Sequence, residues 1–148
     1  MKLLQSYYCN TNTLQLSKKL LGKKLVTNID NKLTSGIIIE TEAYLGINDK
    51  ASHAYNYKKT DRTKTMFKKG GIAYVYLCYG MHYLFNIVCN LQDIPHAILI
   101  RAIEPLDGIH TMEKRRNFIK SFNLTNGPGK LSQALGITNK NNNQSLTG

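Results

Sequence analysis

Two glutamates stand in a stretch of the chain that is otherwise rich in apolar and strand-forming residues. Glu40 and Glu42 are two residues apart, so on a strand their side chains point to the same face, and Tyr44 continues that face. Acids beside an aromatic ring can serve acid–base chemistry. The simpler alternative is that both glutamates are solvated on the outer side of a half-exposed sheet, and the pattern alone leaves both interpretations open.

Arg101 is a stronger anomaly because it interrupts the apolar run 97–103. A buried guanidinium is costly unless a carboxylate neutralises it, so we expect a glutamate from a neighbouring strand as its partner. The alternative is a residue at the sheet edge that extends its charge to water. A glutamate held by arginine would stay ionised and could act as general base on a water molecule. This combination predicts hydrolysis without a metal, and His53 adds an imidazole to the set.

Lysines and tyrosines crowd the middle of the chain. Between positions 47 and 69 the periodic spacing of apolar residues is lost and basic residues accumulate. The next segment carries Tyr74, Tyr76, Tyr79 and Tyr83. Lysines can bind phosphates and tyrosine rings can stack on bases, although tyrosines in strands more commonly pack within the sheet. With 20 Lys and Arg against 9 Asp and Glu, the net charge is +11. An anionic partner is therefore expected, with nucleic acid as the first candidate.

Length and composition narrow the class of protein. A chain of 148 residues can bury a core as one domain without disulfides or metal, and no stretch reaches the roughly 18 apolar residues that a membrane span needs. The N-terminus does not resemble a signal peptide, so a cytoplasmic location is expected, nucleoid-associated if the source is bacterial. Cysteines and histidines lack metal-ligand spacing, and dinucleotide, P-loop and GxSxG motifs are missing. We therefore expect neither a metal nor a cofactor.

The hydrophobic pattern outlines the strands that must position these residues. Five strands are expected, at 24–29, 33–44, 72–79, 81–89 and 96–104. The first two form a hairpin, and Gly36 permits a bend or bulge in the second. The next two reverse at Gly80 and place Tyr79 at the tip of their hairpin. The last strand is nearly all apolar and is therefore expected to be central.

Short helices are expected on either side of these strands in the sequence. The first covers residues 14–21, with Thr13 as a possible cap and Gly22 at its end, and should lie on an edge of the sheet. Another is expected at about 130–135, after a turn that contains glycine and proline.

The C-terminal third of the chain changes its period after the last strand. Residues 109–120 suit a helix with a basic outer face that includes Arg116. Residues 139–148 are rich in asparagine and are expected to form a flexible tail. No repeat or linker divides the chain, so these elements predict one mixed α/β domain with a chiefly antiparallel sheet.

Four blocks of the sequence carry a family resemblance. They are GIIIETEAYLGINDKASHA, TMFKKGGIAYVYLCYGMHYLFNIV, ILIRAIEP and NGPGKLSQALGI. In order and spacing, from about Leu21 to Ile137, they resemble the alkyladenine (3-methyladenine) DNA glycosylases. Together with the pattern above, this predicts a single α+β domain over residues 1–148, with a curved, mainly antiparallel sheet, a protruding β-hairpin and flanking helices.

The resemblance implies an activity and assigns catalytic and pocket residues. It implies a monofunctional DNA glycosylase of base excision repair, which flips alkylated purines out of the duplex and hydrolyses the N-glycosidic bond to leave an abasic site. Glu42 would act on the hydrolytic water, and Arg101 would help to hold that water. The base pocket would be formed by Tyr44, His53, Tyr76 and Asn86, of which the asparagine disfavours guanine.

The resemblance also implies how the DNA is held. Tyr79 would enter the minor groove and fill the gap left by the base, with Met81 beside it. The phosphate backbone would be bound by the basic residues Lys58, Lys59, Arg62, Lys64 and Lys68. The expected partner is double-stranded DNA that contains damaged bases, and the protein is expected to act as a monomer without a membrane, metal or cofactor.

Two other interpretations remain open from the sequence. Members of the family continue beyond the NGPGKL block with strands that help to close the pocket, and this chain is expected to lack them because it ends at Gly148. A basic DNA-binding module that no longer hydrolyses anything is therefore the alternative to an enzyme. An RNA-binding β module without catalysis is a third interpretation, distinguished by a preference for RNA over damaged duplex.

Overall fold

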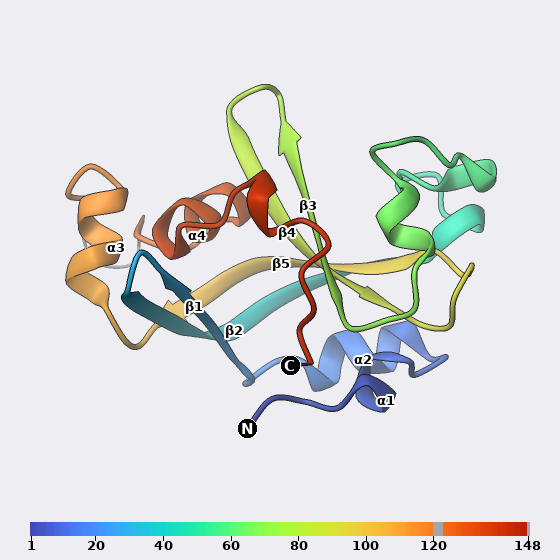
Figure 1. Ribbon diagram of the computed structural model, residues 1–148, viewed down its shortest axis with the longest axis horizontal. Coiled ribbons are helices and arrows are strands. Elements are labelled where there is room, and N and C mark those ends of the chain that lie inside the picture. The colour runs from blue at the N-terminus through green and yellow to red at the C-terminus, as the bar shows by residue number, and fades with distance from the viewer. Residues whose placement is uncertain (120–122, 148) are drawn as a thin grey trace.

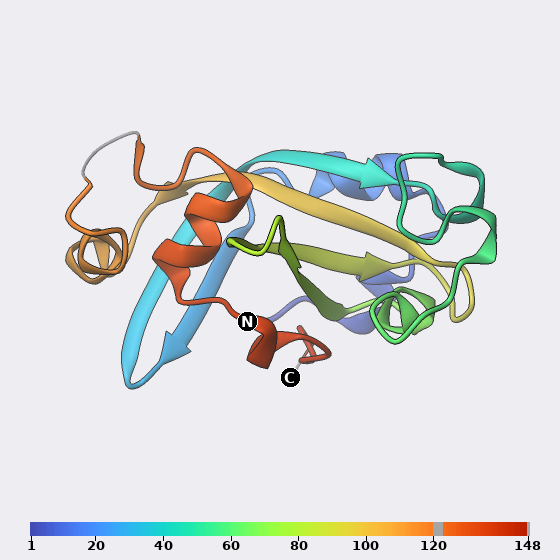
Figure 2. The same ribbon diagram turned by 90° about the horizontal axis from the view of Figure 1, so that it is seen from above.

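A five-stranded antiparallel sheet forms the centre of the computed structural model, which describes residues 1–119 and 123–147. The strand order is β1-β2-β5-β4-β3, so the apolar strand β5 is central, as predicted. The sheet curls, its β3–β4 hairpin protrudes, and β2 and β5 run along most of the molecule (Figures 1 and 2). The strands are β1 (Lys24–Ile29), β2 (Lys32–Tyr44), β3 (Ile72–Cys78), β4 (His82–Cys89) and β5 (His96–Pro105). The predicted α+β fold is confirmed.

Two tight turns set the pairing of the hairpins. Asp30 and Asn31 connect β1 to β2 with φ angles of 54° and 61°, and Tyr79 and Gly80 connect β3 to β4 with φ angles of 53° and 66°. Two consecutive left-handed residues match the twist of the strands that they join. The predicted reversal at Gly80, with Tyr79 at the tip, is therefore confirmed.

The pairing of β2 with β5 contains an irregularity that was predicted at the wrong residue. The register shifts on both sides of Glu40, so Ile39 on β2 and Arg101 on β5 are extra residues without a direct partner. The bulge was expected at Gly36 and instead lies around Glu40. Gly36 instead permits close approach: a Cβ atom there would lie 2.6 Å from Cδ1 of Ile103.

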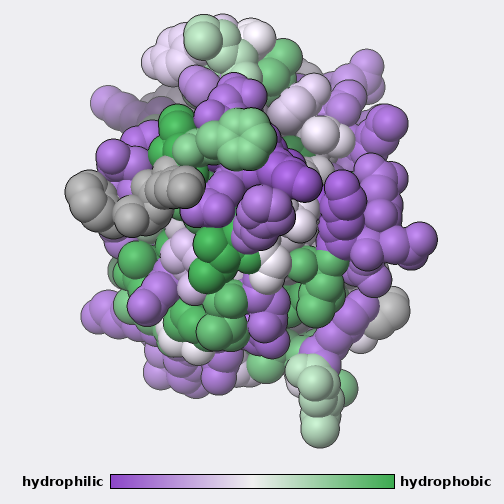
Figure 3. Space-filling model, turned by 90° about the vertical axis from the view of Figure 1, so that its left-hand side faces the viewer, coloured by the Kyte–Doolittle hydropathy of each residue, from purple (hydrophilic) through white to green (hydrophobic). Residues whose placement is uncertain are grey.

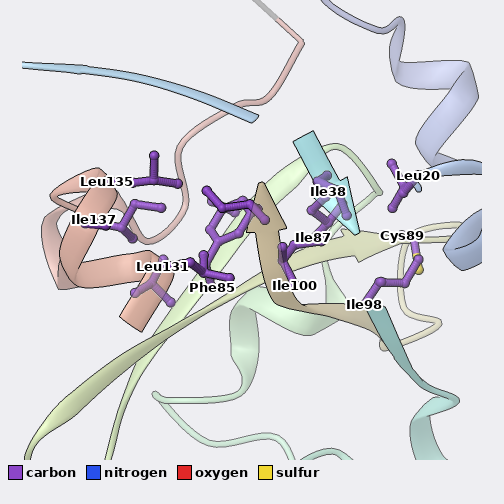
Figure 4. Packing of buried hydrophobic residues seen from close by; sticks show 14 of the residues in the cluster. Leu20, Ile38, Phe85, Ile87, Cys89, Ile98, Ile100, Leu131, Leu135 and Ile137 are labelled. Atoms are coloured by element: carbon purple, nitrogen blue, oxygen red, sulfur yellow. The ribbon is translucent and has the colours of Figure 1, made fainter. Parts of the chain in front are cut away.

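Among the described residues, four α-helices accompany the sheet and contribute to the larger hydrophobic core (Figures 1 and 4). They are α1 (Gln5–Tyr8), α2 (Thr13–Lys19), α3 (Ile109–Arg115) and α4 (Pro128–Leu135). Leu131 of α4 lies next to Phe85 of the sheet, Leu135 and Ile100 belong to the same cluster, and Leu20 approaches from the end of α2. Burial of these apolar side chains holds the helices to the strands.

The first long helix differs from its prediction in two respects. Asn12, not Thr13, is the N-cap of α2, and its side chain accepts a hydrogen bond from the backbone N–H of Gln15. The helix also packs against both β2 and β5, and Leu16 is completely buried. It therefore covers a face of the sheet and does not lie on its edge.

The segment after β5 forms less helix than predicted. Helix α3 ends at Arg115, and the prediction for Lys120 falls outside the described residues. Arg116 is not on a basic outer face: it is buried, and its guanidinium donates hydrogen bonds to the carbonyl oxygens of Asn123 and Leu124. Figure 3 shows this end of the molecule, where hydrophilic side chains surround a smaller group of hydrophobic ones.

A second, smaller core lies on the other face of the sheet. Side chains alternate along a strand, so Tyr74, Val88 and Ala97 point away from the main core and pack with Ala54, Met66 and Phe67. The last three belong to segment 46–69, which contains the short 3-10 helices η1 (Gly46–Asn48), η2 (Tyr55–Tyr57) and η3 (Lys64–Phe67). This segment forms the outer wall of the face that carries the candidate site.

The residues predicted as a flexible tail are part of the fold. Residues 139–147 include η5 (Asn139–Asn141) and then run beside the outer edge of β3, where Ser145 bridges to Ile72. The backbone N–H of Ala73 donates to the carbonyl of Gln144, and its carbonyl accepts from the N–H of Asn143. The prediction of an unstructured tail is therefore wrong for these residues.

Two leucines in helices allow a matched test of this packing. Leu131 in α4 is fully buried, whereas Leu14 in α2 is 54% exposed. We expect Leu131→Ala to lower the free energy of unfolding by about 2 to 5 kcal/mol, because it leaves a cavity. Leu14→Ala should change it by less than about 0.5 kcal/mol. Urea denaturation followed by circular dichroism measures both, and equal losses would contradict the assigned core.

Candidate active site

A small pocket opens on the face of the sheet that segment 46–69 covers. Its volume is about 30 Å³, and its lining is largely aromatic and apolar. The lining residues are Tyr44, Ala51, His53, Met66, Tyr74, Tyr76, Asn86 and Ala97. All four residues predicted for a base pocket, Tyr44, His53, Tyr76 and Asn86, are therefore brought together.

Glu42 and Arg101 form an ion pair beside this pocket. Arg101 Nη1 lies 2.9 Å from Glu42 Oε2, as the sequence had suggested for a cation in an apolar strand. Glu42 pairs with Leu99 of β5, and Arg101 follows two residues later on the same side of that strand. The pair is half-buried, with 43% of the glutamate and 42% of the arginine side chain exposed. Arg101 is thus less buried than expected, and its carboxylate partner remains accessible to water.

Tyr44 connects the ion pair to the pocket. It lies two residues after Glu42 on the same face of β2 and also lines the pocket. Burial, followed by a hydrogen bond to the Glu42 carboxylate and the charge of that carboxylate, raises the pKa of the Tyr44 hydroxyl above its usual range. Tyr44 is therefore neutral at physiological pH, with a hydroxyl that can donate to the neighbouring carboxylate.

Three rings form the inner wall of the pocket. The His53 ring lies 4.5 Å from that of Tyr76 between centroids, and the Tyr74 and Tyr76 rings are 5.3 Å apart. His53 Nδ1 is also 2.9 Å from the Tyr74 hydroxyl, which fixes the imidazole. Burial raises the pKa of Tyr74 to about 12, so the wall presents neutral hydroxyls.

Asn86 lies at the bottom of the pocket. Its side chain is almost fully buried, and its Nδ2 donates a hydrogen bond to the carbonyl oxygen of Tyr74, its partner on β3. A buried amide of this kind costs free energy unless it is hydrogen-bonded. The bond fixes the orientation of an amide that lines the pocket.

The residues predicted to enter DNA lie on the protruding hairpin. Tyr79 is 94% exposed at the turn between β3 and β4, and Met81 is 73% exposed beside it. Large hydrophobic side chains at such a tip are unfavourable in water. Their position is compatible with insertion into another molecule, and the hairpin strand β3 also carries the pocket residues Tyr74 and Tyr76.

The five predicted phosphate ligands do not form one uniform surface. Lys58 is exposed and Lys59 lies 5.2 Å from the Phe67 ring centroid, while Lys64 is 3.9 Å from Asp61. Lys68 is also exposed, but its Nζ donates a hydrogen bond to Asn143. Arg62 differs most, because its guanidinium lies over the ring of Tyr76 at the pocket.

Four lining residues were not predicted from the sequence: Ala51, Met66, Tyr74 and Ala97. Tyr74 was grouped with the hairpin tyrosines, although its spacing from Tyr76 places both on one face of β3. That spacing could have identified it. Met66 comes from η3, and no local signal in the sequence indicates that this turn folds over the sheet.

The arrangement places aromatic rings next to a water-accessible carboxylate. The described residues contain no group of three or more His, Cys, Asp or Glu side chains placed to bind one metal ion. None of the helices in residues 1–119 and 123–147 is long and apolar enough to cross a membrane. At the pocket the described side chains offer a carboxylate, a guanidinium, an imidazole and aromatic rings.

The pocket histidine should make stability depend on pH. Burial, then the charges of Arg62 and Lys58, lower the pKa of His53 from 6.5, and burial also lowers that of His96. A group with a lowered pKa stabilises the fold above its unfolded pKa, and that contribution is lost as the pH falls through the folded pKa. We expect the free energy of unfolding to decrease below about pH 6.5, with a smaller slope in His53→Gln. Urea denaturation at a series of pH values measures this, and an unchanged slope would argue against the buried imidazole.

Comparisons with known proteins identify the family of the chain. Residues 7–148 match the family model of the methylpurine-DNA glycosylases. A protein of Chlamydia felis is 57% identical over 145 residues, covering 97% of this chain and 75% of that protein. One of Clostridium acetobutylicum is 45% identical over 157 residues, covering 100% and 76%. Both have the provisional name 3-methyladenine DNA glycosylase. The chain belongs to the methylpurine-DNA glycosylase family.

Proposed function

We propose that this protein is a monofunctional DNA glycosylase that removes alkylated purines of the 3-methyladenine type in base excision repair. The observation that carries the proposal is the Glu42–Arg101 ion pair at the edge of an aromatic pocket. Family membership and the provisional names of the relatives support the same class of enzyme. The product is a free base and an abasic site, without strand cleavage.

Glu42 is the proposed general base, and Arg101 orients it. The carboxylate accepts a proton from a water molecule while the water oxygen forms a bond to the anomeric carbon of the sugar. The electrons of the broken C1′–N bond pass to the purine. An alkylated purine that was cationic in the nucleotide thus leaves as a neutral base. The carboxylate also stabilises positive charge that develops on the sugar.

Tyr44 and Tyr76 are proposed to hold the flipped base between their rings. Stacking of a base on an aromatic ring contributes about 1 to 3 kcal/mol, and a cationic purine is attracted further by the electron-rich face. His53 supports the wall through Tyr74, and the fixed amide of Asn86 is proposed to disfavour guanine. Selectivity for damaged purines then follows from the positive charge of the base and from the groups on its edge that face Asn86.

The β3–β4 hairpin is proposed to support extrusion of the base. Rotating a nucleotide out of the duplex costs a few kcal/mol. Tyr79, with Met81 beside it, would fill the space that the base leaves and replace part of the lost stacking. The net charge of +11 and the exposed basic residues Lys58, Lys59 and Lys64 would bind phosphates. We propose double-stranded DNA as the partner of a monomeric protein that needs no cofactor.

A conservative change at Glu42 tests the catalytic assignment. Glu42→Gln keeps the shape of the side chain but removes the base, so we expect the rate of base release to fall by at least about 100-fold. Binding to alkylated duplex should remain within a few-fold. Release of radiolabelled 3-methyladenine from alkylated DNA measures the first, and fluorescence anisotropy measures the second.

Glu104→Gln is the matched control, because Glu104 is an exposed glutamate on β5. It should release base at the rate of the unchanged protein. Retained turnover in Glu42→Gln would remove Glu42 from its role. An unchanged protein that binds the duplex without releasing any base would instead indicate a non-catalytic DNA-binding module.

Insertion of Tyr79 into the duplex predicts a difference between duplex and single-stranded substrates. A single strand has no stacked helix from which the base must be extruded, so the contribution of Tyr79 should be specific to the duplex. We expect Tyr79→Ser to reduce kcat/KM on a damaged duplex by about tenfold or more, with a smaller loss on the same oligonucleotide as a single strand. Single-turnover assays on both forms provide the comparison. Equal losses of kcat/KM on duplex and single strand would contradict the insertion of Tyr79.

A further inference from the structure

Arg62 has an unusual partner for a residue expected to bind phosphate. Its guanidinium carbon is 4.9 Å from the centroid of the Tyr76 ring, within the range of a cation–π contact. No carboxylate of the described residues forms an ion pair with it, since its neighbour Asp61 faces Lys64. The partner of this cation in the free protein is therefore the aromatic wall of the pocket.

We propose that Arg62 is the resident cation of the base pocket, covering Tyr76 in the free protein and moving to a DNA phosphate when the duplex binds. Contact with the DNA backbone would thereby uncover the ring surface on which the flipped base stacks. The inference rests on the proposed function, because it treats the same pocket as the site of an extruded base. It adds a device by which DNA binding controls access to that pocket.

The backbone around Arg62 is held by hydrogen bonds, while its side chain is exposed. The N–H of Thr60 donates to Thr63 Oγ1 at 2.8 Å, and the Thr63 hydroxyl donates to the carbonyl of Lys58, also at 2.8 Å. These bonds hold the turn that carries Arg62 close to the pocket. Arg62 itself is exposed at the surface, so its long side chain can reach either the ring or an incoming phosphate.

The ring surface under Arg62 is needed by the proposed ligand. His53 and Tyr74 already pack against Tyr76, with ring centroids 4.5 Å and 5.3 Å away. A guanidinium and an alkylated purine are both flat, delocalised cations that stack on aromatic rings. Because like charges repel and both groups need the same surface, the purine and Arg62 cannot occupy it together.

A phosphate is the natural alternative partner for Arg62. Guanidinium groups form bidentate, charge-assisted hydrogen bonds with phosphate oxygens, which are stronger than an exposed contact with a ring. In the free protein there is no such anion among the described neighbours, so the ring contact persists. Bound duplex supplies the phosphate, and free bases in solution do not.

The position of Arg62 can be followed without any catalysis. In the free protein, the Tyr76 ring current should shift the NMR signals of the Arg62 side chain upfield. Titration with an undamaged duplex should remove that shift, because the phosphates are present although no base is damaged. Arg62 signals that keep the upfield shift in the DNA complex would overturn the proposal.

Loss of the charge should have opposite effects on two ligands. Arg62→Gln uncovers Tyr76, so free 3-methyladenine, a neutral base that stacks on the same ring surface, should bind about two- to fivefold more tightly. The same variant should bind undamaged duplex more weakly, with the slope of log K against log salt reduced by about 0.9. Lys64→Gln, two residues away, is the matched control: it should weaken duplex binding similarly and leave the affinity for the free base unchanged.

Each outcome distinguishes this inference from the proposed function. Unchanged affinity for the free base in Arg62→Gln would make Arg62 a simple phosphate ligand, and lower affinity would make it a wall of the pocket; either result overturns the exchange. Circular dichroism excludes a folding defect as the cause of weaker binding. Release of 3-methyladenine by the unchanged protein tests the proposed function separately, so the exchange can fail while the glycosylase assignment stands.

Discussion

The pairing of β2 with β5 is the constraint on which both the core and the candidate site depend. One side of these strands packs against the helices, and the other side carries Glu42 and Arg101. The two irregularities, at Ile39 on β2 and Arg101 on β5, cancel each other, so the register near Gly36 continues unchanged around Glu42. A single ladder can thus bring backbones very close at Gly36 and still leave an ion pair open to solvent.

Burial on the pocket side of the sheet determines the chemistry of the tyrosines. The pKa of Tyr74 is raised to about 12, chiefly by burial, and that of Tyr76 is raised for the same first reason. Neutral phenols keep their electron-rich faces without adding negative charge. The negative charge at the site therefore belongs to Glu42, whose carboxylate is paired on one side and exposed to water on the other.

Features with local signals were predictable from the sequence, and features that depend on distant contacts were not. The Tyr79–Gly80 turn follows from residue type and strand length, and the Glu42–Arg101 pair follows from the cost of an unpaired cation. The burial of Arg116 depends on carbonyls supplied after α3, and the position of Arg62 depends on how η3 folds over the sheet. Charge alone predicted that Arg116 would face solvent and that Arg62 would bind phosphate.

The C-terminal segment has a consequence for the width of the pocket. Asn142 Oδ1 accepts a hydrogen bond from the N–H of Val75 in β3, while Asn143 Oδ1 accepts from the hydroxyl of Thr65 and from Lys68 in and after η3. Two adjacent asparagines thus join the strand and the turn that face each other across the aromatic cavity. Local unfolding of residues 142–143 would release β3 and η3 at the same time. Heating would therefore disrupt the cavity before the central strands separate.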